Sequence, residues 1–280
     1  CTKSPDGVVA TSGRELRFIA KEVLGEKNPL YGRARTIMKV RPLPFHVTAQ
    51  FVPDCTADEV FRGYAVLGGI PYFWQGLSPK RSMTENLATN LLRENGFLND
   101  EAQSVLRQEF RDPSTYNAIL QAIAFGATTR HEIAQKSLAD SRNLTKYLTV
   151  LEDMGFIERE FSVFAGAGEL SNASRGLYRI ADHYLKFWFR FLATNPVPIM
   201  TRDEALSEWR SSVEPFFSEF ASEAFEEVCR EYLVGLRRAG QLSFRPTVLG
   251  RWWEKNAEID IVAADHDRRH CLVGECKYRN

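Results

Sequence analysis

The stretches EIDIVAAD (258–265) and CLVGECKY (271–278) decide the fold of the C-terminal part of this chain. Each is a short run rich in aliphatic residues, and the polar run HDRRH (266–270) separates them. Two such runs around a polar turn predict a β-hairpin. The strand before them is predicted at TVLGRWW (247–253), and a long helix at about 212–238.

The register of this hairpin determines which side chains meet. If residue 264 faces residue 271, Asp260 lies directly opposite Glu275, and Lys277 lies two residues further along the strand. Directly opposed residues share one face of a sheet, as do residues two apart on one strand. We therefore expect Asp260, Glu275 and Lys277 to cluster on one surface.

Two interpretations of this cluster stay open on spacing alone. Two neighbouring carboxylates repel each other, and a divalent cation such as Mg²⁺ would compensate their charge with oxygen ligands. Lys277 would then orient water and stabilise the charge that develops on a phosphate. The alternative is a solvent-facing hairpin that carries Glu275 and Lys277 as an ordinary surface ion pair.

Residues 113–180 are predicted to form three short helices followed by a hairpin, which is the plan of a winged helix-turn-helix. Thr129 is expected to cap the second helix, and Asp140 or Ser141 the third. In a DNA complex the start of the third helix would face the bases, and an arginine of the wing would contact phosphate. The DNA-binding residues expected on this basis are Arg142, Asn143, Lys146 and Arg175. The acidic residues of the same segment leave a protein-contact role open.

The remaining segments are mostly helical. Residues 1–50 are predicted to hold a helix at 13–25 and a short strand at 36–40, and residues 51–112 to be helical, with a capping box at Thr56 and Glu59. The aromatic helix within 181–204 has too many large rings for one face, so we expect it to be buried between domains.

Bulk composition is that of an ordinary globular protein. Lys plus Arg and Asp plus Glu number 36 each in 280 residues, so no overall basic charge points to a nucleic acid. The five cysteines are scattered without a CxxC pair, which disfavours structural zinc and fits a reducing, cytoplasmic setting. The most apolar segment, YLKFWFRFL (184–192), is far too short to span a membrane.

Two resemblances extend these expectations. EIDIVAAD and GECKYRN, preceded by AFEEVCREYL (224–233), resemble the PD-(D/E)XK restriction-endonuclease-like superfamily. The resemblance implies Asp260 and Glu275 as metal ligands, Lys277 as the lysine of the E-x-K strand, and Glu226 as the acidic residue of the helix, with Glu223 as the less favoured candidate.

The whole chain is similar to the C-terminal portion of archaeal and bacterial AAA+ (P-loop) ATPases that end in a domain of unknown function. Four stretches carry this resemblance in the family's order: NPLYGRARTIMKVRPLPF (28–45), YAVLGGIPYFW (64–74), LYRIADHYLKFWFRF (177–191), and the C-terminal hairpin. It implies an α+β multidomain protein that comprises the tail of a P-loop core (1–50), a helical lid remnant (51–112), a winged helix-turn-helix (113–180), an aromatic linker helix (181–204) and a truncated α/β restriction-endonuclease-like domain (205–280).

The function expected from these resemblances is that of a DNA-binding part of an AAA+-type ATPase with Mg²⁺-dependent phosphodiester hydrolysis at Glu226, Asp260, Glu275 and Lys277. The chain lacks a G-x-x-x-x-G-K-[ST] motif, so ATP would bind only in the complete protein, where Arg33 is a candidate nucleotide sensor and the ATPase core would form a homo-oligomer. The alternative is a DNA- or protein-binding regulatory module whose nuclease-like fold is inactive.

Overall fold

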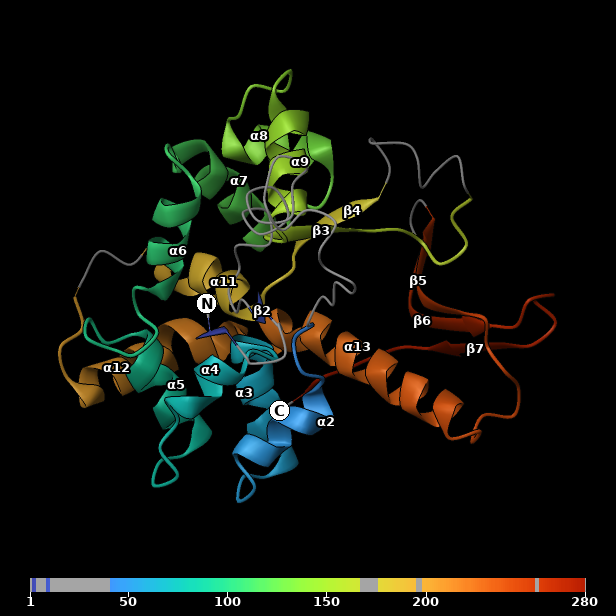
Figure 1. Cartoon of the computed structure of the whole chain (residues 1–280), viewed down its shortest axis with the longest axis horizontal. Coiled ribbons are helices and arrows are strands. Elements are labelled where there is room, and N and C mark those ends of the chain that lie inside the picture. Colours follow the sequence, from blue (N-terminus) through green and yellow to red (C-terminus); the bar gives the residue numbers. More distant parts are fainter. Residues whose placement is uncertain are drawn as a thin grey trace.

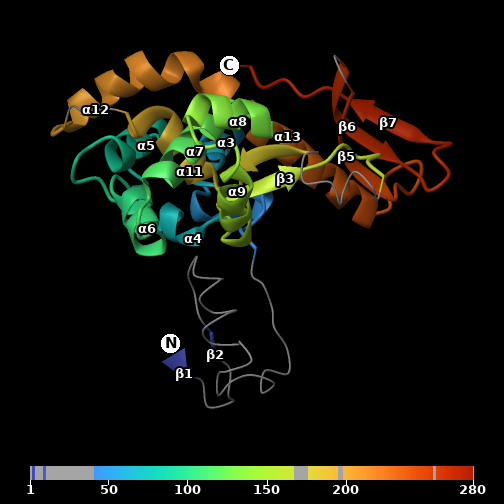
Figure 2. The ribbon, with the colours of Figure 1, turned by 90° about the horizontal axis from the view of Figure 1, so that it is seen from above.

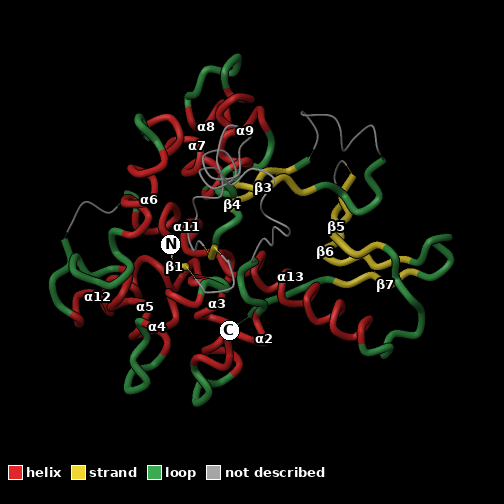
Figure 3. Tube along the Cα trace, viewed as in Figure 1, coloured by secondary structure: helices red, strands yellow, loops and turns green. Residues whose placement is uncertain are grey.

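The computed structural model describes residues 41–166, 176–194, 198–254 and 257–279, together with the short antiparallel strands β1 (Thr2–Lys3) and β2 (Val9–Ala10). The helix predicted at 13–25, the strand predicted at 36–40, Arg33 and Arg175 lie outside the described residues. The architecture is a mixture of helices and small antiparallel sheets, as Figure 3 shows.

A helical body forms one side of the molecule (Figure 1). Its elements up to residue 109 are α2 (Phe45–Thr48), η2 (Ala49–Phe51), α3 (Ala57–Leu67), α4 (Pro71–Gln75), α5 (Met83–Leu91) and α6 (Glu101–Glu109). The predicted capping box is confirmed: the Thr56 hydroxyl accepts from the Glu59 N–H, and the Glu59 carboxylate accepts from the Thr56 N–H. This pair fixes the start of α3, whose residues from Val60 to Leu67 are all buried.

The next segment folds as three helices and a hairpin: α7 (Ser114–Ala124), α8 (Arg130–Ser137), α9 (Leu144–Asp153), β3 (Ile157–Glu160) and β4 (Leu177–Ile180). The two strands are antiparallel, with Ile157 opposite Ile180. Thr129 caps α8 as predicted, again through a capping box. The predicted cap of α9 is wrong. The helix begins after Asn143, because the Asp140 side chain instead accepts the Arg142 N–H within the preceding turn.

The aromatic segment is buried as predicted. It consists of α11 (His183–Phe187) and the π-helical turn η3 (Trp188–Leu192), and Phe187 is fully buried against Trp209 and Phe220. Three further elements continue the body: α12 (Arg202–Glu208), the π-helical turn η4 (Trp209–Val213), and the long helix α13 (Glu214–Arg238). A single hydrophobic core joins these helices with α3–α9 and with the β3–β4 hairpin.

A three-stranded antiparallel sheet lies beside the C-terminal half of α13 (Figure 1). Its strands are β5 (Val248–Glu254), β6 (Ala257–Ala264) and β7 (Cys271–Gly274), with β6 in the centre. Ala264 pairs with Cys271 and Ile261 with Gly274, so the predicted hairpin register is confirmed over its paired length. The buried part of β6 runs from Ile261 to Ala264.

After β7 the chain crosses back to the helical body as a strap, which we define as residues 275–279 (Figure 2). The Ser218 hydroxyl of α13 donates to the Tyr278 carbonyl at 2.8 Å, and the Tyr278 hydroxyl donates to Asp58 at 2.9 Å. The Tyr278 ring packs on Phe61 and Phe225, with centroids 4.6 and 5.8 Å away. Tyr278 therefore ties the strap to both α3 and α13. Among the described helices, none has the length and apolar character needed to cross a membrane.

Candidate functional site

The strap decides where the predicted E-x-K residues lie. Exposure alternates residue by residue from Cys271 to Arg279, so the period of two of strand β7 continues through the strap. Glu275 and Lys277 lie on the outward face and form an ion pair at 2.8 Å, with side chains 71% and 55% exposed. At that exposure the pair resembles the ordinary surface ion pair that the sequence left open.

Asp260 has a different environment. The paired register ends one position short of the expected Asp260–Glu275 pair, and the Asp260 carboxylate accepts the backbone N–H of Cys276 at 2.7 Å. Asp260 is partly buried, whereas the Glu275 side chain is exposed to solvent. Asp260 thus binds the backbone of the strap, while Glu275 and Lys277 bind each other.

Glu226 lies on α13 close to Asp260, but it is already neutralised by arginines. Its carboxylate lies 3.4 Å from Arg230 and 3.3 Å from Arg251. Burial raises the pKa of Glu226 and the Asp260 charge adds to the rise, while Arg251 and Arg230 act to lower it. Glu226 of α13 is thus close enough to Asp260 of β6 to feel its charge, and the guanidinium groups of Arg230 and Arg251 are its counter-ions.

Arg251 of strand β5 was not singled out by the sequence, yet it is the centre of this site. Its guanidinium pairs with Glu160 of β3 at 3.2 Å, with Glu226 of α13, and with Glu258 of β6. Burial acts to lower the pKa of Arg251, but the three carboxylates outweigh it and raise that pKa above its ordinary value. The three partners come from three elements, so Arg251 joins the β3–β4 hairpin, α13 and the C-terminal sheet.

The predicted Mg²⁺ set does not fit this arrangement. Within the described ranges, no group of three or more His, Cys, Asp or Glu side chains is placed to hold a metal ion. Glu275 is paired with Lys277, Asp260 with a backbone N–H, and Glu226 with two arginines. Each expected ligand therefore already has a partner within the protein.

A second charged cluster lies where β4, α11 and α13 meet. Glu223 of α13 pairs with Lys186 and, at 3.5 Å, with Arg179. Although burial acts to raise it, the pKa of Glu223 falls to about 2 because these cations outweigh burial. The less favoured candidate for the helical acid is thus the anchor of an internal ion network.

His183 belongs to the same cluster. Its Nδ1 lies 2.8 Å from the Tyr64 carbonyl oxygen and its Nε2 lies 3.0 Å from the Glu227 carboxylate. Two acceptors require two N–H donors, which only the imidazolium form supplies. Burial acts to lower the pKa of His183, but the Glu227 bond and charge and the Tyr64 bond outweigh it, and the pKa is raised.

The expected DNA-binding residues of α9 are at its exposed N-terminal end. Leu144 and Leu148 point into the core, while Arg142, Asn143 and Lys146 are exposed. The Arg142 side chain is 89% exposed, and its Nε lies 3.3 Å from the Asp140 carboxylate. The Arg130 guanidinium at the start of α8 donates to the Thr145 hydroxyl at 2.5 Å and so ties the two helices together on this face. A polar, partly basic surface results.

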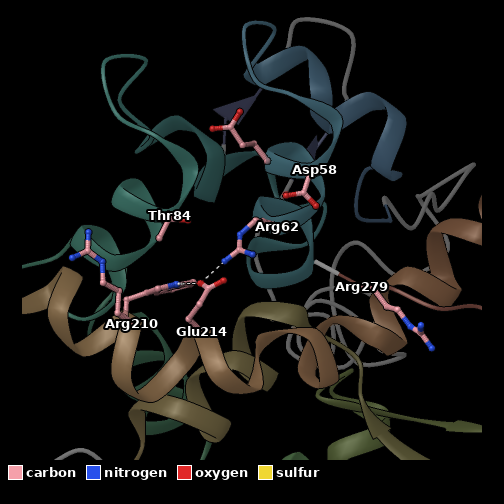
Figure 4. A pocket seen from close by; sticks show the side chains of 8 residues that line it. Asp58, Arg62, Thr84, Arg210, Glu214 and Arg279 are labelled. Atoms are coloured by element: carbon pink, nitrogen blue, oxygen red, sulfur yellow. Dashed lines mark hydrogen bonds and ion pairs between the residues drawn. The ribbon is translucent and has the colours of Figure 1, made fainter.

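An open pocket of about 670 Å³ lies between α3, α5, η4 and the start of α13 (Figure 4). Arg62 is only 7% exposed and pairs with Glu214 at 2.6 Å, and the Trp209 indole N–H donates to the same carboxylate oxygen at 2.8 Å. Arg210 and Arg279 lie at opposite sides of this view, Arg279 being supplied by the strap. The position of the strap therefore sets part of the pocket wall.

Comparison with known proteins finds one family model that is similar to the C-terminal part. Residues 188–280 match the model of DUF234, described as archaea bacterial proteins of unknown function. The matched residues include α13, the three-stranded sheet and the strap, and hence Glu226, Arg251 and Asp260.

Two whole-chain comparisons add relatives. The chain is 30% identical over 268 residues to the uncharacterized protein MJECL04 of Methanocaldococcus jannaschii, covering 96% of this chain and 59% of that protein. The chain thus spans less than two thirds of the length of this relative. The Walker-type ATPase PabY2304 of Pyrococcus abyssi is similar in structure with a TM-score of 0.42 and 22% identity, over 60% of this chain and 48% of the ATPase.

Proposed function

We propose that this chain is a DNA-binding regulatory module of a larger ATPase, and that it acts through the unit formed by α7–α9 and the β3–β4 hairpin. The observation that carries the proposal is the N-terminal face of α9, where Arg142, Asn143 and Lys146 are exposed while leucines of the same helix anchor it in the core. A helix held in this way presents its first turn to a partner, as a recognition helix does in a major groove.

The charges on this face favour a phosphate-bearing partner. Lys146 is exposed together with Arg142, and Asp140 is the carboxylate paired with Arg142. Arginine and lysine supply phosphate contacts, and an asparagine beside them is suited to read adenine in the major groove. The family resemblance assigns ATP turnover, and assembly through a nucleotide-binding core, to the complete protein, and both belong to the proposal.

The experiment is a salt titration of binding to duplex DNA by fluorescence anisotropy. Each phosphate that a cationic side chain neutralises contributes roughly 0.9 to the slope of log K against log salt, so replacing Arg142 and Lys146 together by Ala should make this slope shallower by about 2. The matched control replaces Arg237 and Arg238, two exposed arginines at the end of α13, and should leave the slope unchanged. Equal effects of both double variants would reject α9 as the DNA-binding face.

Metal-dependent hydrolysis by Glu226, Asp260, Glu275 and Lys277 stays a prediction. The confirmed hairpin register favours it, since that register pairs β6, the strand of Asp260, with β7, which leads directly into Glu275 and Lys277. The partners of the individual carboxylates do not favour it, because each is already paired with a cation or a backbone N–H. The regulatory role is therefore the better supported of the two.

A further inference from the structure

The strap runs along α13 in a fixed register. The Ser218 hydroxyl bonds to the carbonyl of Tyr278, and the Phe225 ring lies against the Tyr278 ring. From Phe225, the residue on the same face one turn later is Cys229, at a rise of about 6 Å. From Tyr278, the residue on the same side of the strap is Cys276, about 6.6 Å back along an extended chain. The two displacements agree, so the register brings the thiols of Cys229 and Cys276 together.

Two further observations support this juxtaposition. The alternation of exposure in the strap places Cys276 on its inner face with Tyr278, and the Cys276 N–H is bonded to Asp260 of β6, which lies close to α13. Burial and then the Cys229 thiol are the foremost groups that raise the pKa of Cys276, to about 12. Both cysteines are free and partly exposed, so a small oxidant can reach them.

We propose that Cys229 and Cys276 form a reversible disulfide that fastens the strap to α13. The reaction is thiol–disulfide exchange with a low-molecular-weight disulfide such as oxidised glutathione. The thiolate of one cysteine attacks a sulfur of the small disulfide and displaces one small thiolate, which takes up a proton. The second cysteine then attacks the protein-bound sulfur of the mixed disulfide and displaces the other small thiol. Two protein thiols are oxidised and one small disulfide is reduced to two thiols.

The modification would act on the pocket. The strap carries Tyr278 onto Phe61 and Asp58 of α3 and supplies Arg279 to the pocket wall. In the dithiol form only non-covalent contacts hold the strap, whereas in the disulfide form its position along α13 is fixed. The redox state of the two cysteines thus controls how tightly the strap holds Arg279 at the wall of the pocket. This proposal does not depend on DNA binding by α9.

The test uses the chain as it stands, incubated with oxidised glutathione and then digested with trypsin without reduction. We expect the loss of two protein thiols, a mass decrease of about 2 Da, and a linked pair of the peptides 211–230 and 270–277. Because the second peptide also contains Cys271, the mapping is repeated in Cys271→Ser, where the link should persist. Cys229→Ser and Cys229→Ala should each abolish it while leaving the far-ultraviolet dichroism unchanged.

Two results of the peptide mapping would overturn the proposal. Glutathione adducts on single cysteines without the linked pair would overturn the proposal, and so would a link that is lost in Cys271→Ser. The oxidised wild-type chain should also unfold at a higher temperature than the reduced chain, because the crosslink restricts the unfolded state. An unfolding temperature unchanged on oxidation, in a sample whose linked peptides are quantitative, would show that the strap is not held along α13 as described.

Discussion

Replacing Arg251 by Met should destabilise the protein at the junction that Arg251 forms between β3, α13 and β6. Arg251 is 17% exposed at its side chain and faces the carboxylates of Glu160, Glu226 and Glu258. Methionine keeps an unbranched apolar side chain of similar length but removes the positive charge. The variant therefore leaves the three carboxylates close together without the cation that compensates them, and tests the electrostatic role apart from packing.

The magnitude follows from burial. Removing one partner of a buried ion pair costs about 3–5 kcal/mol. Glu160 and Glu226 are 16% and 12% exposed, whereas Glu258 is 51% exposed and can be solvated on its own. We therefore expect the lower end, about 3 kcal/mol. At about 2–4 °C per kcal/mol for chains of 150–250 residues, the unfolding midpoint should fall by roughly 6–12 °C.

The loss should also depend on pH. Burial already raises the pKa of Glu226 against the opposing effect of Arg251, so removing Arg251 raises this pKa further. A carboxyl group whose folded-state pKa lies above its unfolded value of about 4.3 stabilises the fold below that value and loses this contribution as the pH rises through the folded pKa. The variant should therefore lie closer to wild type at pH 5 than at pH 8.

The assay is thermal unfolding followed by circular dichroism at both pH values. Arg237→Met, at the exposed end of α13, is the matched control and should shift the midpoint by less than about 2 °C, as expected for a surface change. Adding Glu226→Gln to Arg251→Met should recover part of the loss at pH 8. A loss in Arg251→Met that is no larger than in the control, or is identical at pH 5 and pH 8, would refute the reasoning.

Three further predictions concern other elements. Thr129→Ala removes the capping box of α8 and should cost about 1 kcal/mol in denaturant unfolding, whereas Thr149→Ala on the exposed side of α9 should cost much less. For His183, the raised folded pKa means that its stabilisation is present below the unfolded value of about 6.5 and is lost as the pH rises through the folded value. His183→Gln should thus lower the midpoint more at pH 5.5 than at pH 9, and an equal loss at both would contradict the paired imidazolium. Finally, the hydrolytic interpretation predicts Mg²⁺-dependent cleavage of duplex DNA that Asp260→Ala abolishes, whereas a regulatory module leaves the DNA intact in both proteins; a cleavage assay on the two proteins distinguishes these interpretations.

Local rules made much of the fold predictable. The capping boxes at Thr56 and Thr129 and the bounds of α8 follow from side chains that bond to backbone three residues away. The hairpin register follows from a short polar turn between two aliphatic runs. The cap of α9 was mispredicted because Asp140 and Asn143 are both good local acceptors, and the choice between them depends on where the preceding turn closes.

The candidate site was less predictable, because its contacts join distant parts of the chain. Arg251 meets residues from positions 160, 226 and 258, and no spacing rule relates them. A register shift in the β5–β6 pairing falls between Gly250 and Trp252, so simple alternation would not give the direction of Arg251 either. Only one of these partners, Glu226, was among the predicted site residues, and a buried carboxylate needs a counter-charge. The sequence does not show whether a metal ion or an arginine supplies this positive charge.

The strap shows why the spacing of Glu275 and Lys277 was compatible with two answers. A spacing of two residues requires both side chains to share a face, but it does not say which face meets the rest of the protein. The residues that alternate with them, Cys276 and Tyr278, determine which face meets the protein. Tyr278 packs between Phe61 and Phe225, and burying an aromatic ring on apolar neighbours stabilises far more than an exposed ion pair does. Once Tyr278 faces α13, Cys276 must face it as well, and the charged pair must face solvent. The same contact that turns the expected catalytic residues outward is the one that brings Cys276 to Cys229.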